Sequence, residues 1–440
     1  MTSLISKLWW RRYLRRNATS WEELDSFAAL PPDRQRERLG RRLLDQVQYF
    51  GRREDALPEW SEAARIQDPA ELWKIWPSLP VITKQMLHTQ FEPSQLQRRF
   101  GLEGRIDATG GSTGEPTRFF HDWPMLRAIT AQVTYTMIRM GWRPGMPLVS
   151  VWGSERDIGK NVPQKVKLHY QLTRQYQVDG YSLTDSTTDR VLELIRRNKP
   201  VAMYGFTSML EFVARQVHDR GLTVAPGSVR AAWNGGEMLS EAQAEIFRSA
   251  FHVPLFNRYG GRELSTMACQ YTDGGPLVLL RPWLMVDVVN EQGKPVGPGE
   301  SGRLLWTSTV CRGTPFLRYE VEDWGHFRAG DETEAGITAL GGIDGRSAGI
   351  WRAPSGKTIN NLYWNHLFKE FSEVRQFQVI IRKEGTLCFL FRGNGWSAEK
   401  EQKFRQTYTR FLGEIPSEIR WVDEIPRTSR GKRMQVVREN

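Results

Sequence analysis

The stretch from residue 123 to 261 alternates between helical and strand patterns, and this alternation limits the fold more than any other feature. The segment MLRAITAQVTYTMIRMGW has helical spacing, and the apolar run MPLVSVWG that follows is bounded by Pro144, Gly145 and Gly153. The same order then repeats as DRVLELIRRNKP, VAMYGF, SMLEFVARQVHDRG, VRAAWNGG, SEAQAEIFRSAF and VPLFNRYGG. Helices between successive strands indicate βαβ crossovers, so we predict a mostly parallel sheet covered by helices.

The segments on either side of this alternating stretch have different sequence patterns. Residues 1–75 have helical patterns, and we expect one of these helices to begin with Ser20 as its N-cap. From about residue 281 to 343 short strand patterns and Gly/Pro-rich turns predict a β-rich subdomain. We therefore predict an α/β protein with a helical entry region at 1–75 packed on a large core domain at 76–343, whose sheets are parallel or mixed. A small mobile α+β lid should follow at 344–440.

Composition indicates a folded protein in a reducing compartment. No apolar stretch approaches the roughly 18 uninterrupted residues of a spanning helix. The three cysteines, Cys269, Cys311 and Cys388, show no C-x-x-C spacing, so neither a disulfide framework nor a zinc site is expected. The amino terminus lacks the order of a secretory signal. We expect a cytoplasmic protein, with a peripheral location on the inner membrane face as an alternative.

The formal charge of +11 raises the question of a polyanionic partner. The 61 basic residues are dispersed among 50 acidic ones and no nucleic-acid-binding motif appears, so no nucleic-acid partner is expected. Residues 7–16 concentrate arginines with Trp9, Trp10 and Tyr13. This segment is interpreted either as a helix docked by its aromatic face, or as a weak contact with an anionic membrane.

The stretch ATGGSTGEPTRFF at residues 108–120 is rich in glycine and hydroxyl side chains. Glycine lets backbone N–H groups wrap an anion, and Ser and Thr add small donors, so a phosphate is the expected guest. The spacing is not that of a Walker loop. An ordinary surface turn is the alternative for this stretch taken alone.

Four further motifs follow in order, each with an ordinary structural alternative. RYGGRELS should present Tyr259 at the carboxyl edge of the parallel sheet, with Glu263 at the start of a helix. Asp323 is expected in a turn after a strand, and Arg346 in a glycine-rich connector. Lys432 stands on a turn near the end of the chain.

Taken together, these ordered motifs resemble those of the adenylate-forming acyl-activating enzymes, in particular the phenylacetate-CoA ligase and CapK-like branch. The family's phosphate loop is similar to TGGSTGEPT, and its Tyr-Gly-x-Ser/Thr-Glu motif to Tyr259–Glu263, with Arg262 at the hydroxyl position. Its Arg-Tyr-x-x-x-Asp motif resembles 318–323, its Gly-Arg hinge 345–346 and its Pro-Arg-Thr-x-x-Gly-Lys motif 426–432. The resemblance covers about residues 75–440.

The resemblance implies an AMP-forming acid ligase that uses ATP, Mg²⁺ and coenzyme A. The implied catalytic residues are Lys432, Glu263 and Arg346, with Glu263 as the metal ligand and Lys432 bridging the substrate carboxylate and the α-phosphate. Tyr259 would stack on adenine and Asp323 would bind the ribose. The other implied nucleotide-binding residues are Thr109, Gly110, Gly111, Ser112, Thr113, Gly114, Thr117, Gly235, Gly236, Glu237 and Gly260.

Several points stay open from the sequence. Strand ends at Trp152, Tyr204, Gly205 and Trp233 should line the acyl pocket, which would suit a planar or hydrophobic and possibly aromatic acid; core positions are the alternative. Where the family has an acidic hinge residue this chain has Ala348, so transfer to an amine or a sugar hydroxyl, as in polysaccharide or natural-product assembly, is an alternative to a thiol acceptor. A non-catalytic scaffold bound to membrane or nucleic acid is a further alternative.

Overall fold

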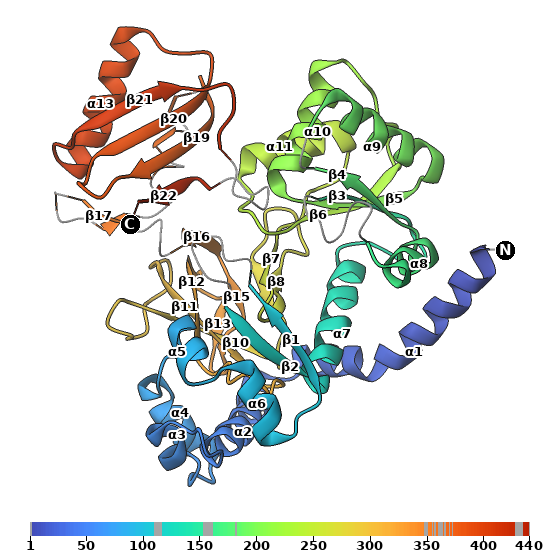
Figure 1. Ribbon diagram of the computed structural model, residues 1–440, viewed down its shortest axis with the longest axis vertical. Helices are drawn as coiled ribbons and strands as arrows, with labels where there is room; N and C mark the ends of the chain where they lie inside the picture. Colours follow the sequence, from blue (N-terminus) through green and yellow to red (C-terminus); the bar gives the residue numbers. More distant parts are fainter. Residues whose placement is uncertain are drawn as a thin grey trace.

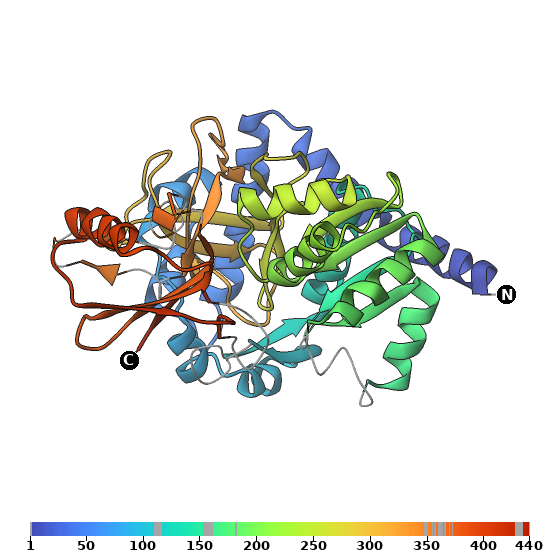
Figure 2. The ribbon, with the colours of Figure 1, turned by 90° about the horizontal axis from the view of Figure 1, so that it is seen from above.

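The computed structural model describes residues 2–109, 117–152, 162–180, 183–346, 351–353, 355, 358–359, 364, 367–368, 370–371, 373–426 and 434–439. A four-stranded parallel sheet, an antiparallel β-rich part and a C-terminal α+β part are distinct in the views of Figures 1 and 2. The chain is thus an α/β protein with mixed sheets, as the alternation predicted.

The amino-terminal part is helical. Its elements are α1 (Thr2–Ala28), α2 (Pro32–Gly51), α3 (Pro58–Ala63), α4 (Pro69–Ile75), the 3-10 helix η1 (Trp76–Ser78), α5 (Lys84–Thr89) and α6 (Pro93–Phe100). The prediction that a helix begins at Ser20 was wrong, because α1 is continuous through it. One side of α1 stays in contact with the body on both sides of Ser20, through Tyr13 and Trp21, so the helix has no reason to break there.

The parallel sheet has the strand order β4-β3-β5-β6. Its strands are β3 (Leu148–Trp152), β4 (Gln175–Asp179), β5 (Val201–Gly205) and β6 (Val229–Asn234), and all neighbours are parallel. The associated helices are α7 (Trp123–Arg139), α8 (Gln164–Thr173), α9 (Asp185–Asn198), α10 (Thr207–Asp219) and α11 (Glu241–Phe251). The predicted βαβ alternation is therefore confirmed, and Ser240 caps α11 as a capping box.

The last predicted strand of this series differs from expectation. Phe256 still exchanges backbone hydrogen bonds with β6, but β7 (Arg258–Gly261) turns away and pairs antiparallel with β8 (Ser265–Cys269). At Arg258 the backbone N–H is bound by the side-chain oxygen of Asn234, at 2.9 Å, instead of by a strand carbonyl. A hydrogen bond to a side chain has replaced the backbone hydrogen bond that a strand neighbour would make. The chain therefore leaves the parallel sheet at Arg258.

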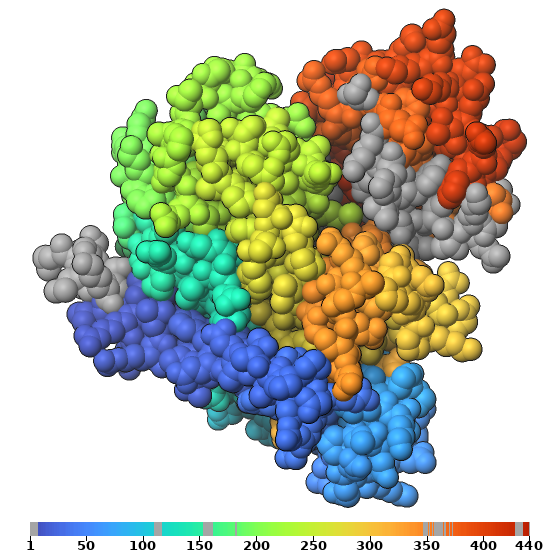
Figure 3. Space-filling view, turned by 180° about the vertical axis from the view of Figure 1, so that it is seen from behind, coloured from blue at the N-terminus to red at the C-terminus, as the bar shows by residue number. Residues whose placement is uncertain are grey.

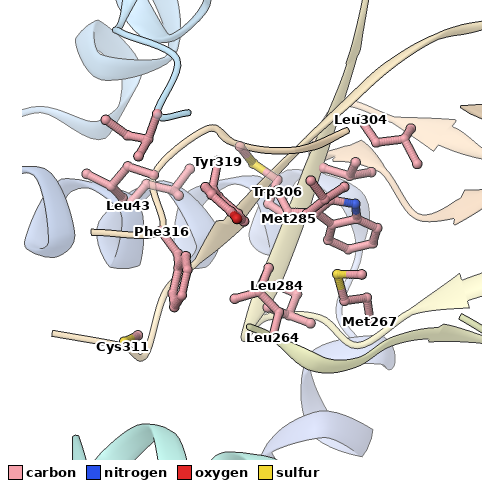
Figure 4. Close-up of a cluster of buried hydrophobic side chains, with 14 of the residues drawn as sticks. Leu43, Leu264, Met267, Leu284, Met285, Leu304, Trp306, Cys311, Phe316 and Tyr319 are labelled. Carbon is pink, nitrogen blue, oxygen red and sulfur yellow. The ribbon is translucent and has the colours of Figure 1, made fainter. Parts of the chain in front are cut away.

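The β-rich part holds the largest of the described cores. One sheet has the order β10-β11-β12-β16, with β10 (Leu284–Val289), β11 (Gly302–Ser308), β12 (Tyr319–His326) and β16 (Gly342–Arg346). The other strands are β1 (Gly104–Ala108), β2 (Arg118–Asp122), β9 (Leu277–Leu279), β13 (Glu332–Thr333), β14 (Gly336–Ile337) and β15 (Ala339–Leu340). Figure 4 shows Trp306, Met285 and Tyr319 in one buried cluster, to which Leu43 of α2 contributes. This shared core fixes the helical region to the β-rich part.

The C-terminal part has its own core. Its elements are β17 (Trp351–Arg352), β18 (Thr358–Ile359), β19 (Val374–Ile381), β20 (Leu387–Gly393), α13 (Ala398–Leu412), β21 (Ser417–Trp421) and β22 (Val436–Arg438). Phe389 and Phe404 are fully buried between the sheet and α13. The predicted domain limits remain predictions; residue 344, where the lid was placed, lies within β16, which pairs with β12.

Candidate active site

The glycine-rich loop lies at the tip of a β-hairpin. Strands β1 and β2 pair antiparallel, and the Thr109 amide donates to the Thr117 carbonyl at 2.8 Å. In return the Thr117 amide donates to Thr109 Oγ1 at 3.0 Å. The base of the loop is thus closed by two hydrogen bonds. The predicted residues Gly110, Gly111, Ser112, Thr113 and Gly114 lie outside the described part of the chain.

Two contacts join this hairpin to the Tyr-Gly motif. Arg262 Nη1 donates a hydrogen bond at 3.3 Å to the carbonyl of Ala108, the residue directly before Thr109. His121 lies 2.7 Å from the Glu263 carbonyl through Nε2. Burial lowers the pKa of His121, so the ring is neutral at pH 7 and Nε2–H donates to that carbonyl. Two motifs about 140 residues apart therefore meet at one place.

Glu263 does not begin a helix, contrary to the sequence prediction. It lies in the turn between β7 and β8, which form an antiparallel hairpin; a Cβ at Gly260 would lie 2.0 Å from the Ser265 carbonyl oxygen, so this close approach requires a glycine. Its residue is buried, and Oε1 accepts a hydrogen bond from the Tyr319 hydroxyl at 3.2 Å. A carboxylate is therefore held in a fixed position beside the loop hairpin.

Tyr259 and Asp323, which were predicted to bind adenine and ribose, lie next to each other. Their side chains are in direct contact. The Tyr259 hydroxyl donates to Asp323 Oδ2 at 2.7 Å. Asp323 was expected in a turn; it instead lies within β12, because β16 adds a further strand and pairs Asp323 with Arg346. The backbone of Arg346 is thus next to this pair, whereas its side chain lies outside the described part.

The loop of Gly235, Gly236 and Glu237 is fixed to the start of α10. The Gly235 amide donates to the Gly205 carbonyl at 3.0 Å. The Glu237 carboxylate accepts from the Ser208 amide at 2.7 Å and from the Ser208 hydroxyl at 3.1 Å. Helix α10 has no side-chain cap of its own, so Glu237 supplies the missing acceptor at the positive end of the helix dipole.

Aromatic side chains gather at the carboxyl ends of β3, β5 and β6. The ring of Tyr204 stacks on Trp152 at 5.0 Å between centroids and on Trp233 at 6.0 Å. Trp233 is only 1% exposed, so it supports the Tyr204 ring, whereas Trp152 and Tyr204 are partly exposed. The guanidinium of Arg258 lies over Tyr204 at 4.9 Å and donates to its hydroxyl at 3.0 Å.

The described residues contain no group of three or more His, Cys, Asp or Glu side chains arranged for a metal ion. Cys269 follows the Tyr-Gly motif, and burial raises the pKa of its thiol to about 12. A metal-binding cysteine must be a thiolate, so this residue does not suit zinc. The buried carboxylate of Glu263 fits a different ion. In nucleotide sites Mg²⁺ takes one or two carboxylates and completes its shell with phosphate oxygens and water.

Residues 178–312 match the family model described as AMP-binding enzyme. This region includes Tyr204, Gly235, Glu237, Tyr259 and Glu263. This part of the chain is therefore similar to AMP-binding enzymes.

Two curated proteins are similar to this chain in sequence. Protein CapK of Staphylococcus aureus is 25% identical over 253 residues, which are 56% of this chain and 52% of that protein. Phenylacetate-coenzyme A ligase of Thermus thermophilus is 24% identical over 289 residues, 64% of this chain and 63% of that protein. The aligned part of the chain thus spans between half and two thirds of these relatives.

Solved structures support the fold of this chain over nearly its whole length. A 2-hydroxyisobutyryl-CoA ligase in its postadenylation state has a TM-score of 0.69 at 18% identity, covering 93% of this chain and 90% of that one. The amide bond synthetase McbA from Marinactinospora thermotolerans has a TM-score of 0.54 at 17% identity, covering 73% and 66%. These structures support the fold, and the resemblance that the motifs indicated is supported by the AMP-binding enzyme match at 178–312 and by the two curated proteins.

Sequence reasoning missed several residues that hold this site together. His121 and Tyr319 fix Glu263, and Asn234 binds both Arg258 and the start of α10. Tyr319 had a signal in the sequence because it lies in the Arg-Tyr-x-x-x-Asp motif, and Arg258 because it directly precedes the Tyr-Gly motif. Lys432 lies outside the described residues, so its predicted role stays a prediction.

Proposed function

We propose that this protein uses ATP to activate a carboxylic acid as an acyl-adenylate and then transfers the acyl group to the thiol of coenzyme A. The observation that supports it best is the meeting of the loop hairpin with the Tyr-Gly motif through Arg262 and His121. A phosphate-binding loop, a fixed carboxylate and an aromatic ring with its acidic partner are what a reaction between ATP and an acid requires.

In the first step a carboxylate oxygen attacks the α-phosphorus of ATP. The bond from that phosphorus to the oxygen bridging to the β-phosphate breaks, and pyrophosphate leaves. Both reactants are anions, so cations and N–H donors must stabilise the transition state. We assign the phosphate contacts to the loop from Thr109 to Thr117, and charge neutralisation at the reacting oxygens to Lys432.

Glu263 would hold Mg²⁺ in this proposal. The ion, when bound, neutralises phosphate charge. The chain's own contribution is to keep the carboxylate in place: Tyr319 binds one oxygen and His121 binds the Glu263 backbone. Tyr259 and Asp323 would bind adenine and ribose, respectively, and their mutual hydrogen bond holds them in register on neighbouring sheets.

The acyl pocket is proposed at the partly exposed rings of Trp152 and Tyr204. Flat walls suit a planar or aromatic acid. Arg258 adds a positive charge over the Tyr204 ring, which would favour acids that carry an additional hydrogen-bond acceptor.

An acid-dependent pyrophosphate-release screen tests the proposal, with the acids grouped as aliphatic, aromatic and hydroxylated. Release of pyrophosphate only in the presence of an acid is the expected result. Adding coenzyme A should then consume the adenylate and release AMP. ATP that stays intact with every acid would contradict the proposal.

An amine acceptor is the second candidate. It is favoured by Ala348 in place of the acidic hinge residue and by the similarity in fold to an amide bond synthetase. If this candidate is right, adenylate formed in the screen will persist with coenzyme A and disappear when amines are supplied.

A further inference from the structure

Helix α1 exposes one stripe of side chains, at the spacing i, i+3, i+4, i+7 and i+8 that aligns residues on one helical face. The members of this stripe are Leu8, Arg11, Arg12, Arg15 and Arg16, and all are exposed. Leu8 is 57% exposed, although it is a large apolar residue. Within residues 8–16 the helix therefore exposes four cations and one leucine, whereas Glu22 and Asp25 are exposed further along α1.

The opposite side of α1 fixes the direction of this stripe. Trp10 packs on Trp142 at 5.0 Å between ring centroids, and the Tyr13 hydroxyl bonds Thr134 of α7 at 2.7 Å. Figure 3 shows α1 lying along the molecule beside α7. Since the aromatic side is held by the body, the arginine stripe cannot rotate inward. Docking of the aromatic face and exposure of the basic face are thus compatible.

Helix α8 extends the same surface. Its His169 ring lies 5.5 Å from Trp9 of α1, and Figure 1 shows α8 beside α1. Lys165, Lys167 and Leu168 are exposed, Leu168 to 55%. Arg174, directly after the helix, is exposed too. We call the exposed residues of 8–16 and 164–174 the α1–α8 surface.

This surface carries charge of one sign only. Neither 8–17 nor 162–175 contains an Asp or Glu, although 50 acidic residues are spread over the chain. None of its Arg and Lys side chains forms an ion pair within the described part of the molecule. Elsewhere exposed arginines commonly have such a partner, as Arg34 and Arg41 have in Glu37. The unpaired cations of the α1–α8 surface are available to an external anion.

We propose that the α1–α8 surface binds a membrane containing anionic lipids. Cations near such a membrane are attracted by its surface potential, and exposed aliphatic side chains can enter the boundary between headgroups and acyl chains. A nucleic acid offers the same charge but gives Leu8 and Leu168 nothing apolar to contact. Such binding does not require a spanning helix, and the described helices include none long and apolar enough to cross a membrane.

The test is co-sedimentation of the full chain with vesicles of phosphatidylcholine, with and without phosphatidylserine. We expect binding only to the anionic vesicles. Each cation contributes about fivefold to partitioning, so replacing Arg11, Arg12, Arg15 and Arg16 by Gln should lower binding by at least about a hundredfold. The matched control replaces four exposed cations of the C-terminal part, Arg375, Lys383, Lys403 and Arg410, and should bind like the wild type.

A second variant separates a membrane from another polyanion. Leu8→Ser with Leu168→Ser keeps every charge, and we expect it to lose vesicle binding roughly tenfold or more while any binding to heparin is unchanged. Equal binding of the leucine variant and the wild type to vesicles would overturn the membrane assignment. So would equal loss in the C-terminal control variant, because binding would then follow net charge alone.

Discussion

Gly235 and Tyr204 form a close contact that makes the proposed acyl pocket testable. A Cβ atom at position 235 would lie 2.9 Å from the Tyr204 hydroxyl oxygen and 3.1 Å from its Cε2, whereas ordinary contacts begin near 3.4 Å. The Gly235→Ala variant must therefore move the ring by about half an ångström. The ring resists this movement, because Trp152 and Trp233 stack on it and Arg258 binds its hydroxyl.

Overpacking of this kind costs about 1–3 kcal/mol. That cost falls on the folded state; if the shifted ring is part of the acyl pocket, kcat/KM for the acid in the pyrophosphate-release assay should also fall, by up to about 100-fold, because the ring then positions the acid wrongly. The thermal unfolding midpoint should also fall, since the contact exists without substrate. Gly297→Ala is the matched control, because the nearest atom to its added Cβ is 3.8 Å away.

The Tyr204→Phe change supplies the internal check. It removes the oxygen that is nearest to the new methyl group, so Gly235→Ala should cost less in the Tyr204→Phe background than in the wild type. Additive effects of the two changes would refute the steric reasoning. An acid kcat/KM that is unchanged in Gly235→Ala despite a lowered midpoint would remove Tyr204 from the acyl pocket.

Three further predictions concern other parts of the chain. Lys432→Ala should lower adenylation about 10²- to 10³-fold while ATP binding persists; unchanged pyrophosphate exchange would refute its role. Glu263→Gln should weaken ATP binding in the presence of Mg²⁺ but not in EDTA, measured by calorimetry; an equal loss in both conditions would count against metal binding. The hydrogen bond to Asp344 raises the pKa of His326 above its usual 6.5, so this pair stabilises the fold at pH values below about 6.5 and less as pH rises through the raised value. His326→Gln should therefore lower the unfolding midpoint at pH 5.5 and change it little at pH 9; a constant difference would contradict this origin.

The fold was predictable where the pattern was local and repeated. Strands β3, β5 and β6 and helices α9 to α11 have clear apolar spacing and turn residues, and they appeared as expected. The prediction that a helix begins at Ser20 failed because a capping signal is local. The packing of Tyr13 and Trp21 that keeps α1 continuous is a tertiary contact.

For the candidate site, the sequence predicted a set of candidate residues but not their backbone arrangement. Ordered motifs pointed to Tyr259, Glu263 and Asp323, yet the expected strand-turn-helix at Glu263 is a hairpin. The cause is a tertiary contact: the Arg258 amide donates a hydrogen bond to the Asn234 side chain, so β7 does not continue the parallel sheet. No local pattern in the sequence encodes that contact.

The central claim is that distant motifs of this chain form one nucleotide site, and hydrogen exchange measured by mass spectrometry tests it most directly. Adding ATP and Mg²⁺ should slow exchange together in 104–109, 258–263 and 319–326, and leave the outer helix α13 unchanged. Protection confined to one of these three segments, or to none of them, would contradict the account.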